Sequence, residues 1–267
     1  MADRLKDKIA FVTGAGSIGP GWGNGKAVAT LFAREGAKIF ALDINAPAAE
    51  ETRDIVTGEG GECTAYQADV TKADEVAAAV EACIAAYGRI DVLHNNVGIV
   101  ESGGPVETSE ESWDRGAAVN LKSVYLTCKY VLPHMERQGG GSIINMASAA
   151  IDLAVPGYGL YAATKAAVTQ LTQSFAVEAG PDGIRVNVLA PGLTLTNFTK
   201  RHSRNPDGSL NPEKYEAFVS AMRKTSPLDR VGEAIDQAWL VLYLASDASR
   251  FCTGQIWRAN GGAAIPH

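Results

Sequence analysis

Short apolar runs alternate along the chain with longer segments in which apolar residues recur every three or four positions. Val76, Val80 and Cys83, for example, share one face of a helix that Gly88 ends. Strands that alternate with helices predict a parallel sheet with right-handed crossovers, so we expect a doubly wound α/β sheet. Its seven expected strands are Ile9–Val12, Lys38–Leu42, Cys63–Tyr66, Ile90–His94, Ser142–Met146, Ile184–Leu189 and Gln255–Arg258.

The composition favours one domain rather than several. Of the 267 residues 46% are hydrophobic, so the chain can bury a large core without disulfides or metal ions. No linker rich in proline or serine divides it, and the one loop-like stretch of note covers residues 203–212. We therefore expect a single domain over residues 1–267.

Charge and metal-ligand spacing exclude two classes of function. The net charge is −6, and no cluster of lysine and arginine would neutralise a run of phosphates, so we expect no nucleic-acid partner. The cysteines lack CxxC spacing and do not pair with the histidines at metal-ligand intervals, so we expect no metal site. The cysteines are Cys63, Cys83, Cys128 and Cys252, which we interpret as buried thiols in a reducing compartment.

The apolar runs also bear on location. The first eight residues alternate charges and contain no apolar signal segment, and no apolar run is long enough to span a bilayer. We therefore expect a cytoplasmic protein with no membrane partner.

A glycine-rich segment from Gly14 to Gly25 joins the first predicted strand to a helical pattern at 26–32. Glycines allow the backbone to approach a pyrophosphate, whose charge is met by the N–H groups at the start of a helix. The second strand leads to Asp43, whose carboxylate can accept hydrogen bonds from the ribose hydroxyls of the adenosine half. We therefore expect a dinucleotide site. The simpler alternatives are an ordinary turn for the glycines and a helix cap for Asp43.

Further short motifs follow in a recognisable order. They are Asp69-Val70, Asn95-Asn96-Val97-Gly98, Asn120 between Val119 and Leu121, Ser148, Tyr161-Ala162-Ala163-Thr164-Lys165 and Pro191-Gly192. With these motifs and the glycine-rich segment, the chain resembles the short-chain dehydrogenase/reductase family over essentially its whole length. The resemblance implies a Rossmann-type domain that transfers a hydride between a nicotinamide dinucleotide and an alcohol or carbonyl carbon.

One segment departs from the family pattern. Eight residues, 15–22, separate Gly14 from Gly23, which is more than the family places there. We expect the extra residues to lie in the loop, although a register through Gly19-Pro20-Gly21 would move the start of the helix. The insertion is either a neutral surface bulge or part of a reshaped adenosine or phosphate pocket.

The catalytic prediction rests on a proton that must move together with the hydride. Ketone reduction requires a proton donor beside the carbonyl oxygen, and the reverse reaction requires a base there. Tyrosine can act near neutral pH if its pKa falls from ~10 by roughly three units, which needs about 4 kcal/mol of phenolate stabilisation. Tyr161 and Lys165 lie four residues apart and therefore on one face of a helix, so the ammonium can supply much of it.

Two more polar residues complete the predicted catalytic set. Ser148 is expected to end the fifth strand, at the edge of the sheet where ligands sit, and to polarise the substrate oxygen; a turn or helix cap is the simpler alternative. Asn120 interrupts an apolar helical run in which asparagine is a poor helix former, so we expect a functional role or a kink there. The resemblance implies a water-linked proton relay from Asn120 to Lys165.

The resemblance also implies a set of cofactor contacts. The expected contacts are Gly14, Ser17, Ile18, Gly23, Asn24, Asp43, Asp69, Val70, Asn96, Gly98, Tyr161, Lys165, Pro191, Gly192, Thr194 and Thr196. We expect NAD(H) rather than its phosphorylated form, because Asp43 would repel a 2′-phosphate and no basic residue follows it in 44–46.

A segment at about 193–230 is expected to cover the substrate. Its aromatic and apolar residues predict a partly helical lid, and His202 is interpreted as an exposed loop residue; the lid residues are Phe198, His202, Tyr215, Phe218 and Met222. The substrate is an alcohol or ketone of unknown identity. Ala149, Ala150 and Ile151 offer it no charged anchor, whereas Asp152 and Glu101 do.

Two other functions remain open. In a divergent enoyl-thioester reductase branch of the family the catalytic tyrosine lies seven residues before the lysine, and Tyr158 has that spacing from Lys165. A non-catalytic NAD sensor or scaffold is the third reading, which the intact catalytic set disfavours.

The resemblance to the family also implies a homotetramer built through the two long helices that contain Asn120 and Tyr161. Their apolar content exceeds one narrow core-facing stripe and includes Val124, Leu126, Val131, Ala167, Val168, Leu171 and Phe175.

Overall fold

The computed structural model describes residues 3–200, 203–205 and 207–265. Its main sheet has seven strands in the order β3-β2-β1-β4-β5-β6-β9, and all neighbouring pairs are parallel. The strands are β1 (Ile9–Thr13), β2 (Lys38–Asp43), β3 (Cys63–Gln67), β4 (Val92–Asn95), β5 (Gly141–Met146), β6 (Ile184–Leu189) and β9 (Ile256–Trp257). The strand order reverses between β1 and β4, so a ligand crevice is expected at the carboxyl ends of these strands.

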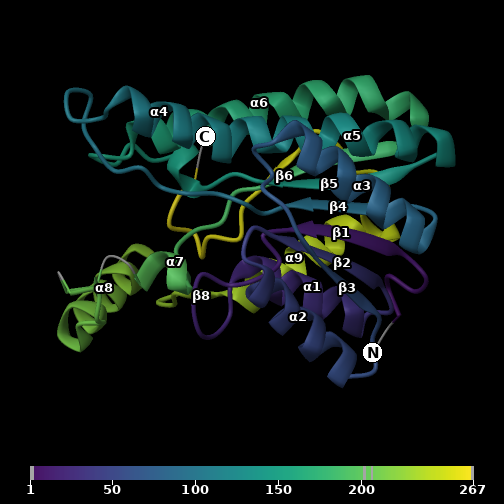
Figure 1. Cartoon of the computed structure of the whole chain (residues 1–267). Helices are drawn as coiled ribbons and strands as arrows, with labels where there is room; N and C mark the ends of the chain where they lie inside the picture. The colour runs from purple at the N-terminus through teal and green to yellow at the C-terminus, as the bar shows by residue number, and fades with distance from the viewer. Residues whose placement is uncertain (1–2, 201–202, 206, 266–267) are drawn as a thin grey trace.

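Helices cover both faces of the sheet (Figure 1). One layer contains α3 (Ala73–Tyr87), α5 (Ser123–Gln138) and α6 (Gly159–Ala179), with α4 (Glu110–Ala117) at its end. The other contains α1 (Asn24–Arg34), α2 (Ala46–Gly58) and α9 (Ala234–Ala245). The predicted doubly wound α/β fold is therefore confirmed.

Burial on both faces explains the continuous apolar runs of the strands. All five residues of β1 are buried, as are the four central residues of β2. Phe11 and Leu93 face the cluster under α3, α5 and α6, whereas Val12 and Val92 face the cluster under α1 and α9. Parallel strands that are covered on both faces read as apolar runs rather than as alternating patterns.

Two predicted strands are shorter or shifted in the structure. β4 starts at Val92 rather than Ile90, because the backbone N–H and C=O of Ile90 are bonded to the side chain of Gln138. β9 is limited to Ile256–Trp257, because the N–H of Gln255 donates to the side chain of Asn187.

The fifth strand ends two residues before Ser148, at Met146, so the expectation that Ser148 terminates it was wrong. Ser148 instead caps the short 3₁₀ helix η2 (Ala149–Ile151), as its side chain accepts from the N–H of Ala150 at 3.2 Å. The simpler alternative, a cap, is thus present at Ser148.

A small parallel sheet that the pattern did not predict joins β7 (Thr194–Leu195) to β8 (Gly232–Glu233). Between these two strands lie α7 (Asn197–Lys200) and α8 (Pro212–Thr225), so the expected lid segment is partly helical. His202 lies outside the described residues. In Figure 1, α7 and α8 project from the end of the sheet at the lower left, away from α4.

The four cysteines are free thiols. Cys83 and Cys128 are buried as expected, but Cys63 and Cys252 are only half-buried. Burial raises the pKa of the Cys63, Cys83 and Cys128 thiols to about 12, so these three are poor nucleophiles. Within the described ranges, no helix has the length and apolar character required to span a membrane.

The apolar residues on which we based assembly mostly face the core of the same chain. Four of the seven are buried there, namely Val124, Leu126, Val131 and Val168, and the rest are partly covered. The argument for an interface therefore rests on the three partly exposed residues, Ala167, Leu171 and Phe175. The same two helices nevertheless expose Tyr125 and Val177.

Candidate active site

Tyr161 and Lys165 lie on consecutive turns of α6 and face the sheet. Lys165 is almost fully buried, and its Nζ donates to the carbonyl of Met146, the last residue of β5, at 2.8 Å. That nitrogen lies 6.0 Å from the ring centroid of Tyr161. Burial lowers the pKa of Lys165 to about 8, so the side chain still carries its positive charge at neutral pH. The structure thus holds a cation beside the phenol, as the four-residue spacing predicts.

Asn120 sits in a π-helix, η1 (Ala118–Lys122), between α4 and α5. Its Oδ1 accepts from the N–H of Ile99 at 2.8 Å, and its Nδ2 donates to the carbonyl of Ile99 at 3.0 Å and to Oγ1 of Thr164 at 3.1 Å. The predicted irregularity at Asn120 is therefore confirmed. Its amide is engaged with these partners and fixes the position of the π-helix against the loop after β4 and against α6.

Thr164 is a residue that sequence reasoning missed. Its hydroxyl donates to the carbonyl of Tyr161 and accepts from Asn120, so it joins the helix of the tyrosine to the π-helix. The available signal was its position, since Thr164 lies three residues after Tyr161 and therefore on the same face of α6.

The loop after β4 passes close to Asn120 and Lys165 at Gly98. A Cβ at this position would lie 3.1 Å from Nζ of Lys165 and 3.3 Å from Oδ1 of Asn120. Glycine is therefore the residue that lets the backbone pass so close to the buried ammonium.

Ser148 lies two residues beyond the carbonyl that holds Lys165, on the turn that leads into η2. The N–H of Ala149 donates to the carbonyl of Pro191 at 2.9 Å, which ties this turn to the segment after β6. Ser148, Asn96 and Pro191 thus all follow the carboxyl ends of adjacent strands, as the motif positions predicted.

The glycine-rich loop is closely packed against the loop after β4. Gly14 has a φ of +60°, a conformation that favours glycine, and its carbonyl accepts from Nδ2 of Asn96 at 2.9 Å. A Cβ on Gly25 would collide with that same carbonyl. α1 begins at Asn24, after Gly23, so the extra residues lie in the loop and the register through 19–21 is excluded.

The start of α1 fits the expected dinucleotide. Its first-turn N–H groups have no partner within the helix, which favours a bound anion. Oδ1 of Asn24 is buried and, among the described residues, lacks a hydrogen-bond partner. An orphaned polar atom at this point is consistent with a ligand that would satisfy it.

Asp43 accepts hydrogen bonds from the backbone of its own chain, in addition to any contact with ribose. Its Oδ2 accepts from the N–H of Gly16 and its Oδ1 from the N–H of Asn45, both at 2.9 Å. The carboxylate therefore holds the glycine-rich loop against the end of β2. Each oxygen retains a lone pair, so the contacts remain compatible with ribose hydroxyls as additional donors.

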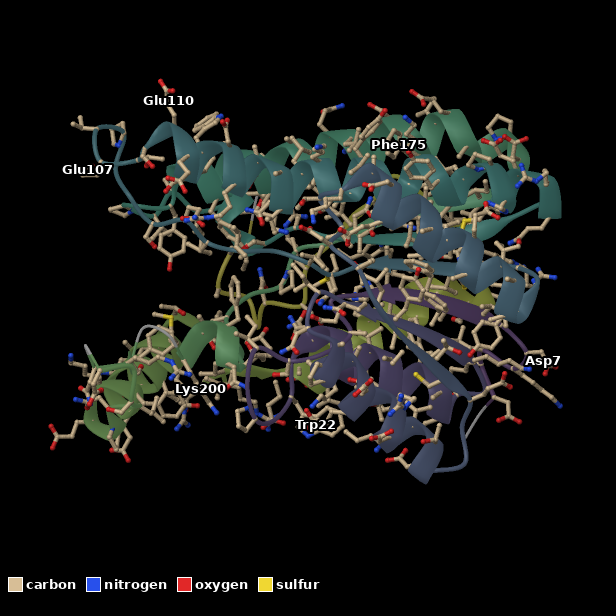
Figure 2. All side chains as sticks on the ribbon, viewed as in Figure 1. Asp7, Trp22, Glu107, Glu110, Phe175 and Lys200 are labelled. Carbon is tan, nitrogen blue, oxygen red and sulfur yellow. The ribbon has the colours of Figure 1, made fainter. Side chains whose placement is uncertain are left out.

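The insertion makes contacts that neither of our two interpretations included. Nδ2 of Asn197, the first residue of α7, donates to the carbonyl of Pro20 at 2.8 Å and to Oγ of Ser17 at 3.2 Å. Lys26 binds the C-terminal part of the insertion, because its Nζ donates to the carbonyl of Gly21 at 3.3 Å. In Figure 2, Trp22 of this loop and Lys200 of α7 lie in the same, lower half of the molecule. The insertion is therefore tied to the lid segment, while Ile18 is 78% exposed.

The remaining predicted cofactor residues lie at the same edge of the sheet. Asp69 turns its carboxylate toward Thr71, accepting from its N–H and its hydroxyl, and Val70 is buried. Thr194 and Thr196 are buried as well, and the hydroxyl of Thr194 accepts from Gln237.

The Pro191-Gly192 turn packs directly on the C-terminal segment, because a Cβ on Gly192 would lie 2.6 Å from Cα of Asn260.

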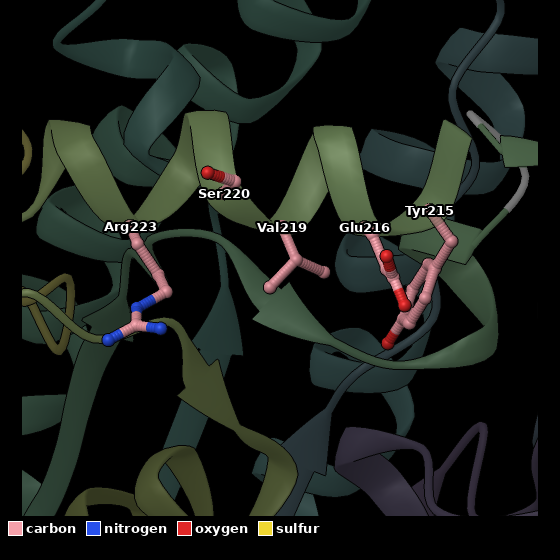
Figure 3. Close-up of a pocket in the computed structure, with 5 residues that line it drawn as sticks. All are labelled: Tyr215, Glu216, Val219, Ser220 and Arg223. Carbon is pink, nitrogen blue, oxygen red and sulfur yellow. The ribbon is translucent and has the colours of Figure 1, made fainter. Parts of the chain in front are cut away.

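Two cavities lie under α8 and contain none of the predicted catalytic residues. One, of about 200 Å³, is lined by Tyr215, Glu216, Val219, Ser220 and Arg223, which project from one side of the helix (Figure 3). The other, of about 460 Å³, is lined by Leu195, Val219, Arg223, Asp229, Arg230, Val231, Glu233 and Asp236. Side chains alternate along a strand, so Leu195 faces away from Thr194 and Thr196. We therefore assign neither cavity to the catalytic residues.

Comparison with known proteins places this chain in a family. Residues 19–264 match the protein family described as Enoyl-(acyl carrier protein) reductase. The chain is 38% identical to the 3-oxoacyl-acyl-carrier-protein reductase FabG of Thermotoga maritima over 262 residues, which cover 98% of this chain and all of that protein.

Two solved structures share the fold. A 7α-hydroxysteroid dehydrogenase complexed with NADH and 7-oxoglycochenodeoxycholic acid has a TM-score of 0.88 at 32% identity, covering 100% of this chain and 97% of that one. A short-chain type dehydrogenase/reductase from Mycobacterium marinum has a TM-score of 0.87 at 30% identity, covering 99% and 98%. The chain belongs to the short-chain dehydrogenase/reductase family of oxidoreductases.

Proposed function

We propose that this protein reversibly transfers a hydride between NAD(H) and a secondary alcohol or ketone. The observation that carries the proposal is the buried Lys165 ammonium, anchored to the end of β5 and 6.0 Å from the ring of Tyr161. A buried cation without a carboxylate partner costs folding free energy. Its retention beside a phenol therefore favours a role in stabilising phenolate.

Each catalytic residue has a distinct part in the proposed reaction. In alcohol oxidation, the Tyr161 phenolate takes the hydroxyl proton as the hydride leaves the carbon; in ketone reduction, the phenol returns that proton to the oxygen. Lys165 stabilises the phenolate, and Ser148 orients the substrate oxygen. Asn120 maintains the π-helix beside Lys165. We propose that protons pass between Lys165 and solvent by way of this π-helix. When bound, a nicotinamide dinucleotide would supply or accept the hydride.

The expected cofactor is NAD(H) rather than NADP(H). Asp43 presents a carboxylate at the end of β2, and the next residue, Ile44, is 64% exposed and uncharged. A 2′-phosphate at this position would meet a negative charge and no cation from the segment that follows. The residues that would hold the dinucleotide are the predicted contacts from Gly14 to Thr196 named above.

A second candidate is enoyl-thioester reduction, which the description of the matched family and the seven-residue spacing of Tyr158 favour. Tyr158, however, precedes the first residue of α6, whereas Tyr161 lies inside the helix, one turn before Lys165. The rings of Tyr158 and Tyr161 meet edge to face, with centroids 6.1 Å apart. Substitution of each tyrosine in turn separates the two reactions.

The test compares Tyr161→Phe with Tyr158→Phe in assays that follow NADH and NADPH absorbance over a panel of alcohols, ketones and one conjugated enoyl thioester. Tyr161→Phe keeps the ring but removes the proton donor, so we expect a loss of about 10²-fold or more in kcat, with NADH binding retained. Tyr158→Phe should have a much smaller effect.

Other outcomes assign other functions. If Tyr158 is the essential residue and the enoyl thioester the better substrate, the protein is an enoyl reductase. If NADH binds tightly but neither substitution changes any detectable turnover, the protein is a sensor or scaffold. Equal use of NADH and NADPH would overturn the assignment of Asp43 to the ribose.

A further inference from the structure

Four segments lie at the carboxyl edge of the sheet, where Ser148 and the loop that contacts Asn120 also lie, and we call them the fixed wall. They are 99–104 after β4, 148–158 after β5, 190–196 after β6 and 256–260 at β9. Backbone hydrogen bonds join them, from Gly103 to Gly157, from Ala149 to Pro191 and from Gly192 to Ala259. The fixed wall contains three charged residues, Glu101, Asp152 and Arg258.

Asp152 directly follows η2, the turn that Ser148 caps. The guanidinium of Arg258 binds it through two hydrogen bonds, from Nε to Oδ2 at 2.8 Å and from Nη2 to Oδ1 at 3.0 Å. The side chain of Asp152 is 9% exposed and that of Arg258 is 24% exposed. The pair is mostly withdrawn from water, and this contact raises the pKa of Arg258. Both charges are therefore satisfied within the chain.

Glu101 is neutralised in the same way. Nε and Nη2 of Arg115, on α4, donate to its two carboxylate oxygens at 2.7 and 2.8 Å. This contact lowers the pKa of Glu101, which therefore stays ionised and paired. Glu101 also lies beside the residue that precedes Tyr161, since a Cβ on Gly116 would meet both Leu160 and Cγ of Glu101.

The sequence suggested Asp152 and Glu101 as charged anchors for a substrate, but each is already bound to an arginine of the chain. The other residues of the fixed wall are uncharged, and Leu153 and Val155 expose apolar side chains at 43% and 45%. A substrate carboxylate or ammonium on this wall would lose hydration and gain no unpaired counter-charge from it.

We propose that the substrate is an uncharged, predominantly apolar alcohol or ketone, and that the Asp152–Arg258 pair determines this selectivity by keeping the guanidinium from anionic substrates. The inference rests on the proposed hydride transfer at Tyr161. It goes further, since it assigns a substrate class and a specificity-determining pair on the fixed wall, in which Asp152 follows the short helix that Ser148 caps.

The first test compares wild-type kcat/KM for matched substrates that differ by one charge, such as 2-octanone, 7-oxooctanoate and the methyl ester of that acid. We expect the two neutral ketones to exceed the carboxylate by about tenfold or more, because the fixed wall offers the anion no free cation. A wild-type preference for the carboxylate would overturn the proposal.

The second test frees the arginine. Asp152→Asn leaves the Arg258 guanidinium without its carboxylate, so the ratio of kcat/KM for the acid to that for its ester should rise about tenfold or more, the range of a charge-assisted hydrogen bond. The double variant Asp152→Asn/Arg258→Gln removes both charges and should return the ratio toward the wild-type value. An unchanged ratio in Asp152→Asn would contradict the role of the pair.

A remote pair provides the control. Arg34 and Glu59 form the same two-bond arrangement between α1 and the end of α2, and Glu59→Gln frees Arg34 on that side of the molecule. It should leave the acid-to-ester ratio unchanged. If Asp152→Asn does not fold, the wild-type comparison still decides the substrate class. If wild type turns over neither the acid nor the neutral ketones while NADH binds, the proposed function fails rather than this inference.

Discussion

Lys165 shows how one residue can be retained against its cost to stability. Its ammonium is almost fully buried and has no carboxylate partner among the described hydrogen bonds and ion pairs; it donates to the carbonyl of Met146. Lys26 is buried to the same degree, but its Nζ lies 2.7 Å from the carboxylate of Glu51. Two buried lysines in one chain thus differ in whether a counter-charge accompanies them, which allows a matched comparison.

We expect Lys165→Met to abolish turnover yet stabilise the apo protein at pH 7. The drop in the pKa of Lys165 from 10.5 to about 8 corresponds to about 3 kcal/mol of unfavourable burial. Loss of the hydrogen bond to Met146 offsets part of this, which leaves a net gain of about 1–2 kcal/mol. Thermal and denaturant unfolding of both proteins would measure it.

The stability that Lys165→Met gains over wild type should depend on pH. The unfolded lysine keeps its proton up to about pH 10.5, whereas the folded one releases it near pH 8, so unfolding takes up a proton between these values. Wild-type stability should therefore rise over this window relative to Lys165→Met, and the advantage of the variant should shrink. Lys26→Met is the control and should be destabilised, because it removes the ion pair with Glu51 and the hydrogen bond to the carbonyl of Gly21. A loss of stability in Lys165→Met comparable to that in Lys26→Met would refute the argument.

At the scale of elements, side-chain hydrogen bonds of the chain itself join the inserted loop to the lid segment. Asn197 binds two points of the loop, Ser17 and Pro20, and Asp43 binds a third at Gly16. The loop follows β1 and the lid follows β6, so the contact spans the expected cofactor crevice at the strand ends. Ordering of one element should therefore help to order the other.

We expect Asn197→Ala to weaken NADH binding about fivefold to twentyfold, because about 1–2 kcal/mol of hydrogen bonding no longer holds the loop to α7. Fluorescence titration would give the Kd. Asn205→Ala is the matched control, since the described contacts of Asn205 are within 205–211 of the lid segment. It should change Kd far less. Equal Kd values for Asn197→Ala and wild type would show that the tie has no part in binding.

At the scale of the whole molecule, the outer surface of α5 and α6 is the place where we propose that four copies meet. Tyr125 is 44% exposed on α5 and Val177 is 79% exposed on α6, and Figure 2 shows Phe175 on the same helical layer. Large apolar side chains at the surface of neighbouring helices are typical of an interface.

We expect sedimentation velocity at micromolar concentration to give a particle of four times the chain mass of 28.0 kDa. A charge at a buried interface is unfavourable, so Val177→Asp should shift the protein to smaller species. Leu228→Asp changes an exposed leucine outside these helices and should leave the tetramer intact. A monomeric wild type would end the tetramer proposal.

Much of the fold and of the geometry of the candidate site was predictable, because both depend on patterns that are local in the chain. The apolar runs identified the strands of the main sheet, and the four-residue spacing placed Tyr161 and Lys165 on one helical face. Two errors in the strand bounds arose where a distant side chain took over a backbone group. Gln138 bound Ile90 and Asn187 bound Gln255, and each shortened a predicted strand.

By itself, the sequence determined the doubly wound order, the glycine loop before α1 and the spacing of Tyr161 and Lys165 on one helix, since periodicity and steric limits act over a few residues. Only the tertiary structure decided which groups became partners. Arg258 reaches Asp152 across 106 positions and Asn197 reaches Pro20 across 177, and both contacts exist because the carboxyl ends of parallel strands converge on one edge. The charge of a site depends on such pairings. A carboxylate that the sequence offered as an anchor is therefore neutralised once the chain has folded.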